Sequence, residues 1–335
     1  MLRRSLPTVT GLVVGVVVTL AVLLPGYVGL DGITPFVQLA ALTPMVLVVV
    51  MASAFVGRFA SVLVRRKGPP LDERRPRLFA VGFAVLIGAA FVALAAAGIV
   101  GSRLLADDAP AGPRGPPVLT LNADQGRADV DALAALVRER GADVVVLPEA
   151  GNLFRARLTA LLPDYRGYSA EASRTDDEAS TSVLLGPRVQ QPQVRTVPGA
   201  LFSTLDVTLS SVRIVAVHTA APFPPERVGL WQEDLERLVA PVCASPPTSP
   251  TILVGDLNAT PDQSAFRAAT AGCTDALPSV GAGAVATYPT DLPRWFGIQI
   301  DHVLVGGGLG VADAEVLDVP GTDHRAVLAR LVAPA

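Results

Sequence analysis

The sequence predicts three N-terminal transmembrane α-helices followed by an α/β sandwich, in which two packed mixed β-sheets are flanked by helices. Two observations lead to this fold class. The first 102 residues contain three long apolar runs without charge, in a chain of which half the residues are hydrophobic. After them, short β-rich apolar segments alternate with amphipathic helical segments, without the strict rhythm of a parallel βαβ fold.

The three apolar runs cover residues 8–30, 33–57 and 78–101. Each exceeds the roughly 20 residues that cross a bilayer core, and backbone groups in lipid must bond internally, so each run is expected to be a helix. Arg3 and Arg4 precede the first run and seven basic residues lie between the second and third, whereas the only charge between the first and second is Asp31. The positive-inside rule therefore predicts a multi-pass cell-membrane protein whose C-terminal domain lies outside the cytoplasm.

A linker is expected at residues 106–117, which read ADDAPAGPRGPP and are small, polar and proline-rich. It separates an anchor at 1–105 from a domain at 118–335. That domain is acidic, because the residues after Ser102 hold 27 of the 30 acidic side chains but only 18 of the 27 basic ones, a net charge of −9. Proteins that bind nucleic acids usually present a basic face, so nucleic acid is not the expected substrate.

The elements of the sandwich are expected in a mixed order. A strand at 118–123 is followed by a helix at 128–140, which has one apolar face and ends at Gly141. The remaining expected elements are a buried strand at 143–150, a helix at 152–162, several strands within 181–220, a helix at 226–239, a strand at 251–257, a short helix at 264–271, and strands at 298–305 and 324–331.

Polar side chains gather where these strands end. Asn122 and Asp124 are two residues apart at the exit of one strand, and Asp256 and Asn258 repeat that spacing at another. A spacing of two places both side chains of a pair on one face. Glu149 ends an apolar strand, where an unpaired carboxylate is costly to bury. A hard divalent cation would offset that cost.

All three histidines lie in short motifs of distinct sequence: His218 in AVHTAAP, His302 in IQIDHVLVG and His324 in PGTDHRAV. Strand alternation places Asp301 and His302 on opposite faces, so only one of them enters a shared site, and the residues alone leave open which. Acids, amides and histidines in this order along the chain favour a hydrolytic enzyme.

Six of these motifs resemble the endonuclease/exonuclease/phosphatase superfamily over residues 118–332. They are LNAD, LPEA, AVHTAAP, VGDLNATP, IQIDHV and GTDHR. The chain departs from the usual pattern at Pro148, Ala216 and Gln299, where Gln, Asn and Arg are common, which weakens the expectation of nuclease-type contacts. The predicted spans add a resemblance to a membrane branch that includes teicoplanin- and vancomycin-resistance proteins.

The resemblance implies a role for each motif. Glu149 is the expected direct ligand of Mg²⁺ or Mn²⁺, with Asn122 or Asp124 and with Asp323, because oxygen ligands suit these ions. His324 is the expected general base, oriented by Asp301. Asp256 would position or activate the nucleophile, while Asn258 and His218 would donate hydrogen bonds to the transition state. The inward role of Asp301 assigns His302 to the packing face.

The expected function is that of a membrane-anchored, metal-dependent phosphoesterase at the outer membrane surface. Its substrate would be a phosphate ester or pyrophosphate, plausibly lipid-linked and of the undecaprenyl type. The alternatives are an extracytoplasmic nuclease and a non-catalytic surface binding domain. Cys243 and Cys273 fit either two buried thiols or a disulfide, and we predict the disulfide because both follow helices that flank the GDLN strand. Trp295 fits the core or a substrate-contacting lip, with the core preferred.

Overall fold

The computed structural model describes residues 13–14, 16–50, 52–53, 90, 92–108, 110–170, 177, 179–199, 201–244 and 250–333. The chain divides into two compact units, Met1–Ser102 and Arg103–Ala335.

The described residues of the first unit are mostly helical. Helical residues 16–23 are followed by the 3-10 helix η1 (Pro25–Tyr27), then by α2 (Phe36–Ala41), by helical residues 43–50 and by helical residues 92–102. Proline interrupts these segments, since it fixes φ and lacks a backbone N–H, and Pro25 opens η1 directly after the first helical segment. The described residues bury a small apolar cluster of Leu23, Leu24, Leu47, Val92, Ala93 and Ala96.

No helix in the described part of the chain is both long enough and apolar enough to cross a bilayer. The prediction of three transmembrane helices is therefore wrong, and so is the predicted multi-pass membrane localisation with an extracytoplasmic domain. The physical reason is that a run without charge need not form one helix: the run at 8–30 breaks at Pro25, and the run at 33–57 has a turn at Leu42. The parts of the predicted spans at 8–12, 15, 51, 54–57, 78–89 and 91 lie outside the described residues. The predicted lipid-bilayer partner loses its main support.

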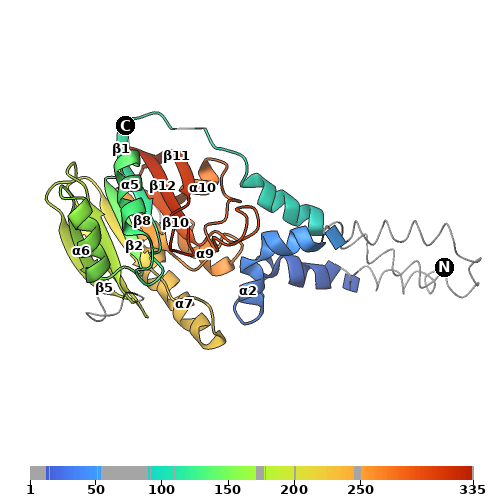
Figure 1. Ribbon diagram of the computed structural model, residues 1–335. Coiled ribbons are helices and arrows are strands. Elements are labelled where there is room, and N and C mark those ends of the chain that lie inside the picture. Colours follow the sequence, from blue (N-terminus) through green and yellow to red (C-terminus); the bar gives the residue numbers. More distant parts are fainter. Residues whose placement is uncertain are drawn as a thin grey trace, which may run out of the picture. The chain divides into compact units, whose positions relative to one another are not determined.

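The second unit is a sandwich of two six-stranded mixed sheets (Figure 1), which confirms that part of the predicted fold. The strand orders are β11-β12-β1-β2-β4-β3 and β5-β6-β7-β8-β10-β9. The first sheet comprises β1 (Arg114–Thr120), β2 (Val144–Pro148), β3 (Arg166–Ala170), β4 (Thr181–Leu185), β11 (Gly310–Leu317) and β12 (Ala326–Val332). The second comprises β5 (Gln193–Pro198), β6 (Ser203–Thr208), β7 (Arg213–His218), β8 (Thr251–Asp256), β9 (Thr274–Asp275) and β10 (Asp301–Gly306). The pairs β1–β2 and β7–β8 are parallel, so their carboxyl ends lie at the same edge of each sheet.

Helices α5 (Val130–Arg140) and α6 (Asn152–Leu161) lie beside the first sheet (Figure 1). Asp129 caps α5 by accepting hydrogen bonds from two backbone amides, and Gly141 ends it with φ +63°. The other helical elements are η2 (Pro225–Arg227), α7 (Val228–Asp234), the π-helical turn η3 (Leu235–Val239), α8 (Ala240–Cys243), α9 (Ser264–Thr270) and α10 (Ala276–Ser279). A disulfide joins Cys243 at the end of α8 to Cys273 beyond α9, which confirms that prediction.

Two apolar layers hold the sandwich together. Alternate residues of β2 enter different layers: Val144 and Val146 pack between the sheets, whereas Val145 and Leu147 pack under α5 and α6. Both faces of β2 are therefore buried, which explains its continuous apolar run.

The segment predicted as a linker is attached to the second unit. Ala106 forms a β-bridge with Val280, the backbone N–H of Asp107 donates to the carbonyl of Ser279, and β1 already begins at Arg114. The predicted division at 105 and 118 stays a prediction.

Candidate active site

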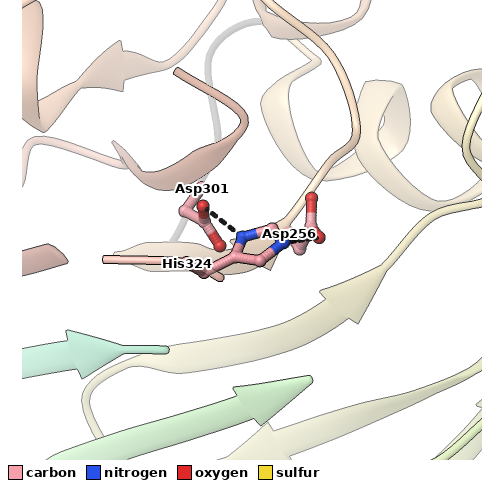
Figure 2. A group of neighbouring side chains, drawn as sticks. All are labelled: Asp256, Asp301 and His324. Atoms are coloured by element: carbon pink, nitrogen blue, oxygen red, sulfur yellow. Dashed lines mark hydrogen bonds and ion pairs between the residues drawn. The ribbon is translucent and has the colours of Figure 1, made fainter. Parts of the chain in front are cut away.

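Three neighbouring strands of the second sheet place polar side chains in one row. The register pairs His218 of β7 with Asp256 of β8, and Asp256 with Asp301 of β10. His324, which precedes β12 of the other sheet, lies beside the two carboxylates (Figure 2). Four motifs that are far apart in the sequence therefore meet at one edge of the sandwich.

Asn122 connects the first sheet to this row. Its amide Nδ2 donates to Glu149 Oε1 at 3.0 Å and to Asp256 Oδ2 at 3.0 Å. Asn122 and Glu149 lie side by side because the β1–β2 pairing continues beyond the strands, with the Ala123 N–H donating to the Pro148 carbonyl. One buried amide thus ties together the acidic groups of both sheets.

The two motifs with a spacing of two residues form the same local turn. Asn122 Oδ1 accepts from the backbone N–H of Asp124 at 2.9 Å, and Asp256 Oδ1 accepts from that of Asn258 at 2.8 Å. Asp124, Glu149 and Asn258 have φ values of 48°, 55° and 45°, in the left-handed region that costs these residues about 1 kcal/mol or more. Backbone strain is therefore concentrated at this edge. Asn258 Nδ2 donates to the carbonyl of Thr219, so its amide is oriented by the end of β7.

His324 and Asp301 form a buried dyad. His324 Nδ1 bonds to Asp301 Oδ2 at 2.9 Å, and its Nε2 lies 3.9 Å from Asp256 Oδ2 and 3.9 Å from Asp323 Oδ1. Burial alone would lower the pKa of His324, but the charge and hydrogen bond of Asp301 outweigh it and raise that pKa to about 10. Burial, followed by the charge of Asp301, raises the pKa of Asp256 to about 7. The neighbouring carboxylates thus favour the protonated form of this imidazole.

His218 is held by packing. Its ring stacks on Phe202 with centroids 4.0 Å apart and planes 2° from parallel. Among the described residues, its buried Nδ1 has no hydrogen-bond partner, while Nε2 lies 3.8 Å from Asp256 Oδ2 and 3.9 Å from Glu149 Oε1. Burial, followed by the charge of His324, lowers the pKa of His218 to about 3. This histidine is therefore neutral.

One group of side chains in the described part of the chain could hold a divalent cation. Asp256, Asp301 and His324 offer ligand atoms within 4.8 Å of one another. Of the predicted metal ligands, Asp124 forms an ion pair with the exposed Arg127. The Asp124 hydrogen bond raises the pKa of Arg127, and the charges of Asp323 and Glu149 raise it further. Burial raises the pKa of Glu149 and of Asp323, so their negative charge is not fully compensated within the chain. Such an oxygen-rich set suits a hard cation.

Of the remaining predictions, one is confirmed and one is wrong. His302 is fully buried on the packing face, as expected, with Nδ1 2.8 Å from Asp275 Oδ2 and Nε2 2.9 Å from the Ala259 carbonyl. Trp295, which we expect in the core, is instead 69% exposed. Tyr288, whose ring centroid lies 4.9 Å from that of His324, belongs to the site but to none of the motifs. Its only sequence signal is its place in the segment that precedes the IQIDHV strand.

Comparison with known proteins agrees with this geometry. Residues 119–324 match the sequence profile of the Endonuclease/Exonuclease/phosphatase family. No curated protein matches the sequence.

Three solved structures have a similar fold. An AP endonuclease from Archaeoglobus fulgidus is 13% identical, with a TM-score of 0.52 over 64% of this chain and 98% of that chain. A mannosyl-6-phosphatase from Bacteroides thetaiotaomicron is 14% identical, with a TM-score of 0.51 over 65% and 100%. Humanized D. rerio TDP2 is 14% identical, with a TM-score of 0.50 over 65% and 99%. At these identities, the likeness establishes the fold alone.

Proposed function

This chain belongs to the endonuclease/exonuclease/phosphatase family, whose members are metal-dependent hydrolases of phosphate esters, and we propose that the edge around Asn122, Asp256 and His324 is its catalytic centre. The observation that carries the proposal is the hydrogen-bonded convergence of both sheets there, with Asn122 between Glu149 and Asp256 and the His324–Asp301 dyad beside them. A site that only supported the fold would not need several incompletely compensated carboxylates in one place.

Glu149 would hold the metal ion, with Asn122 or Asp124 and with Asp323. Mg²⁺ or Mn²⁺ bound there would polarise a phosphoryl oxygen and stabilise the charge that develops on it. Glu149 is suited to this role because the hydrogen bonds from Asn122 and from the Gln125 backbone do not fully offset the cost of burying its carboxylate. Its pKa is therefore raised. The same group of carboxylates would attract the cation before any substrate binds.

Asp256 would position the attacking water, and its place between Asn122 and the dyad orients its carboxylate. The dyad itself fits two roles. The family resemblance implies that His324 is the general base, which needs a neutral ring. The raised pKa of His324 instead favours an imidazolium that donates Nε2–H to a phosphoryl oxygen. Asn258 and the neutral His218 would donate further hydrogen bonds to the transition state.

The substrate is a phosphate ester or pyrophosphate, and the net charge of −9 after Ser102 disfavours a long polyanion such as DNA. The lipid-linked, undecaprenyl-type substrate and the likeness to glycopeptide-resistance proteins remain finer predictions. The acidic charge argues only against DNA as the alternative, and the predicted spans no longer support the lipid-linked substrate. An AP endonuclease among the proteins of similar fold keeps nucleic acid as the second candidate.

A substrate panel tests the proposal. The full-length protein with Mg²⁺ is given a generic phosphomonoester, a phosphodiester, undecaprenyl pyrophosphate and duplex DNA, with Glu149→Ala as the blank. We expect metal-dependent release of phosphate or alcohol from at least one of the small or lipid-linked substrates, and none with the blank. Efficient cutting of DNA alone would establish a nuclease, and no turnover of any substrate would favour a binding domain.

A further inference from the structure

The loop that precedes β10 is folded around one buried arginine. Arg325 is 3% exposed and follows His324 directly. Its Nη1 donates to the carbonyls of Ala286 and Pro289, its Nη2 to those of Thr290 and Leu292, and its Nε to Asp318 Oδ1, at distances between 2.8 and 3.3 Å. A planar guanidinium with five donors in fixed directions can hold four carbonyls of one loop at once, which a lysine cannot.

The same loop is bonded to the dyad. The backbone N–H of Arg325 donates to the Thr287 carbonyl at 2.7 Å. The Thr287 hydroxyl oxygen accepts from the backbone N–H groups of Ile300 at 3.1 Å and Asp301 at 3.2 Å. The N–H of Thr290 donates to the Asp323 carbonyl at 2.9 Å. The position of the loop is therefore coupled to both members of the His324–Asp301 pair.

Tyr288 is the residue that this loop presents to the site. Its backbone exchanges two hydrogen bonds with Ile298, at 3.0 and 2.8 Å. Its ring centroid lies 4.9 Å from that of His324, with the planes 46° apart. Burial raises the pKa of its phenol, and the charges of Asp323, Asp291, Asp256 and Asp124 raise it further. The ring of Tyr288 thus lies at the same edge of the sandwich as the His324–Asp301 dyad. Within the described residues, no protein group forms a hydrogen bond with the Tyr288 hydroxyl.

The arginines of this region are committed to other partners. Arg127 is bound to the carboxylate of Asp124 by two of its nitrogens. Arg325 is used by the loop carbonyls and by Asp318. Among the described residues, an incoming phosphoryl group would therefore be met by other donors, and the Tyr288 hydroxyl is one that no protein group there already uses.

Resting on the proposed phosphoesterase function, we propose that Tyr288 is a further catalytic residue, whose hydroxyl donates a hydrogen bond to the phosphoryl group of the substrate. Arg325 is a positioning residue, because it holds the loop that places the Tyr288 ring against the ring of His324.

Tyr288→Phe removes only the hydroxyl and keeps the ring against His324. A hydrogen bond to a charged group stabilises by an amount that corresponds to a roughly 10- to 100-fold change, so kcat/KM of the full-length protein should fall by that factor. Tyr165→Phe is the matched control, because the Tyr165 hydroxyl donates to the Ala142 carbonyl at the start of β2, at the other end of that strand from Glu149. It should lower stability and leave kcat/KM unchanged.

A second measurement does not depend on turnover. Binding of inorganic phosphate in the presence of Mg²⁺, followed by calorimetry, should weaken in Tyr288→Phe and not in Tyr165→Phe. Arg325→Lys should cause a loss of kcat/KM similar to that of Tyr288→Phe, and combining the two should cost little more than either alone, because both act through one contact.

The possible outcomes distinguish the role of Tyr288 from the proposed phosphoesterase function. If the wild type turns over a phosphate ester and Tyr288→Phe matches it within twofold in kcat/KM and in phosphate affinity, the role of Tyr288 is refuted while the proposed function stands. If the wild type is inactive but Tyr288→Phe still weakens phosphate binding, the proposed function fails and the Tyr288 contact survives. If the wild type neither turns over an ester nor binds phosphate, both fail.

Discussion

Asn122 is the side chain that links the two sheets at the catalytic edge, and its replacement tests that geometry most directly. Asn122→Ala removes two N–H donors that lie 3.0 Å from the carboxylates of Glu149 and Asp256. Asn122→Asp keeps the size and the acceptor oxygen used by the Asp124 N–H, but turns both donor contacts into contacts between acceptors. The two variants therefore separate the loss of a hydrogen bond from the gain of a repulsion.

The magnitude follows from the two bonds. A hydrogen bond to a charged group contributes about 1.5–3 kcal/mol, so two contribute at most about 3–6 kcal/mol. Water can enter the space left by Asn122→Ala and solvate both carboxylates, which offsets part of the lost hydrogen-bond energy. We therefore expect the free energy of unfolding to fall by about 2–4 kcal/mol. For a unit of this size, that lowers the melting temperature by roughly 5–15 °C.

The assay is thermal and urea unfolding without metal and with Mg²⁺, next to kcat/KM. Asn122→Asp should be the less stable variant without metal, and Mg²⁺ should raise its melting temperature by more than that of the wild type, because one more carboxylate then faces the cation. If Asn122→Asp without metal is as stable as Asn122→Ala, the placement of Asn122 between the carboxyl groups of Glu149 and Asp256 is wrong.

Three further predictions concern residues around this centre. Glu149→Ala should abolish turnover and also the Mg²⁺-dependent rise in melting temperature, and a persisting rise would move the metal to other ligands. Replacing Cys243 and Cys273 by Ala opens a disulfide between residues 30 apart, which should lower the free energy of unfolding by about 3–4 kcal/mol in urea titrations, and an unchanged midpoint would contradict the bond. His302→Phe leaves the Asp275 carboxylate without its buried partner and should cost about 3 kcal/mol of stability, with little change in kcat per folded molecule. A fully folded but inactive His302→Phe would instead give this histidine a part in the chemistry.

Local sequence patterns predicted much of the sandwich and of its candidate site. The helices expected at 128–140 and 152–162 appear as α5 and α6, since an apolar stripe and a glycine stop act within a few residues. Polar residues at strand ends could be expected to converge, because neighbouring parallel strands end at the same edge. The same kind of reasoning gave a wrong prediction of membrane spans, because hydropathy measures how apolar a segment is but does not show whether a helix continues past Pro25.

Alternation along β10 established only that Asp301 and His302 face opposite ways. Their assignment needed neighbours from elsewhere in the chain: Asp301 meets His324, whereas His302 meets Asp275 and Ala259. Tyr288 and Arg325 could not be found from the sequence for the same reason. Their roles depend on contacts between the loop before β10 and residues just before β12, more than thirty residues further along the chain.

What the sequence determined by itself is the inventory: the acids, amides and histidines, their place at strand ends, and the apolar runs that must be buried. Only the tertiary structure decided which of them touch. The register of β7, β8 and β10 aligns His218, Asp256 and Asp301 in one row, and the packing of the two sheets brings Asn122 within hydrogen-bonding distance of Asp256. The physical reason is range: hydrophobic period and turn chemistry act between near neighbours along the chain, whereas register and sheet packing are set by contacts among residues that only the folded chain brings together.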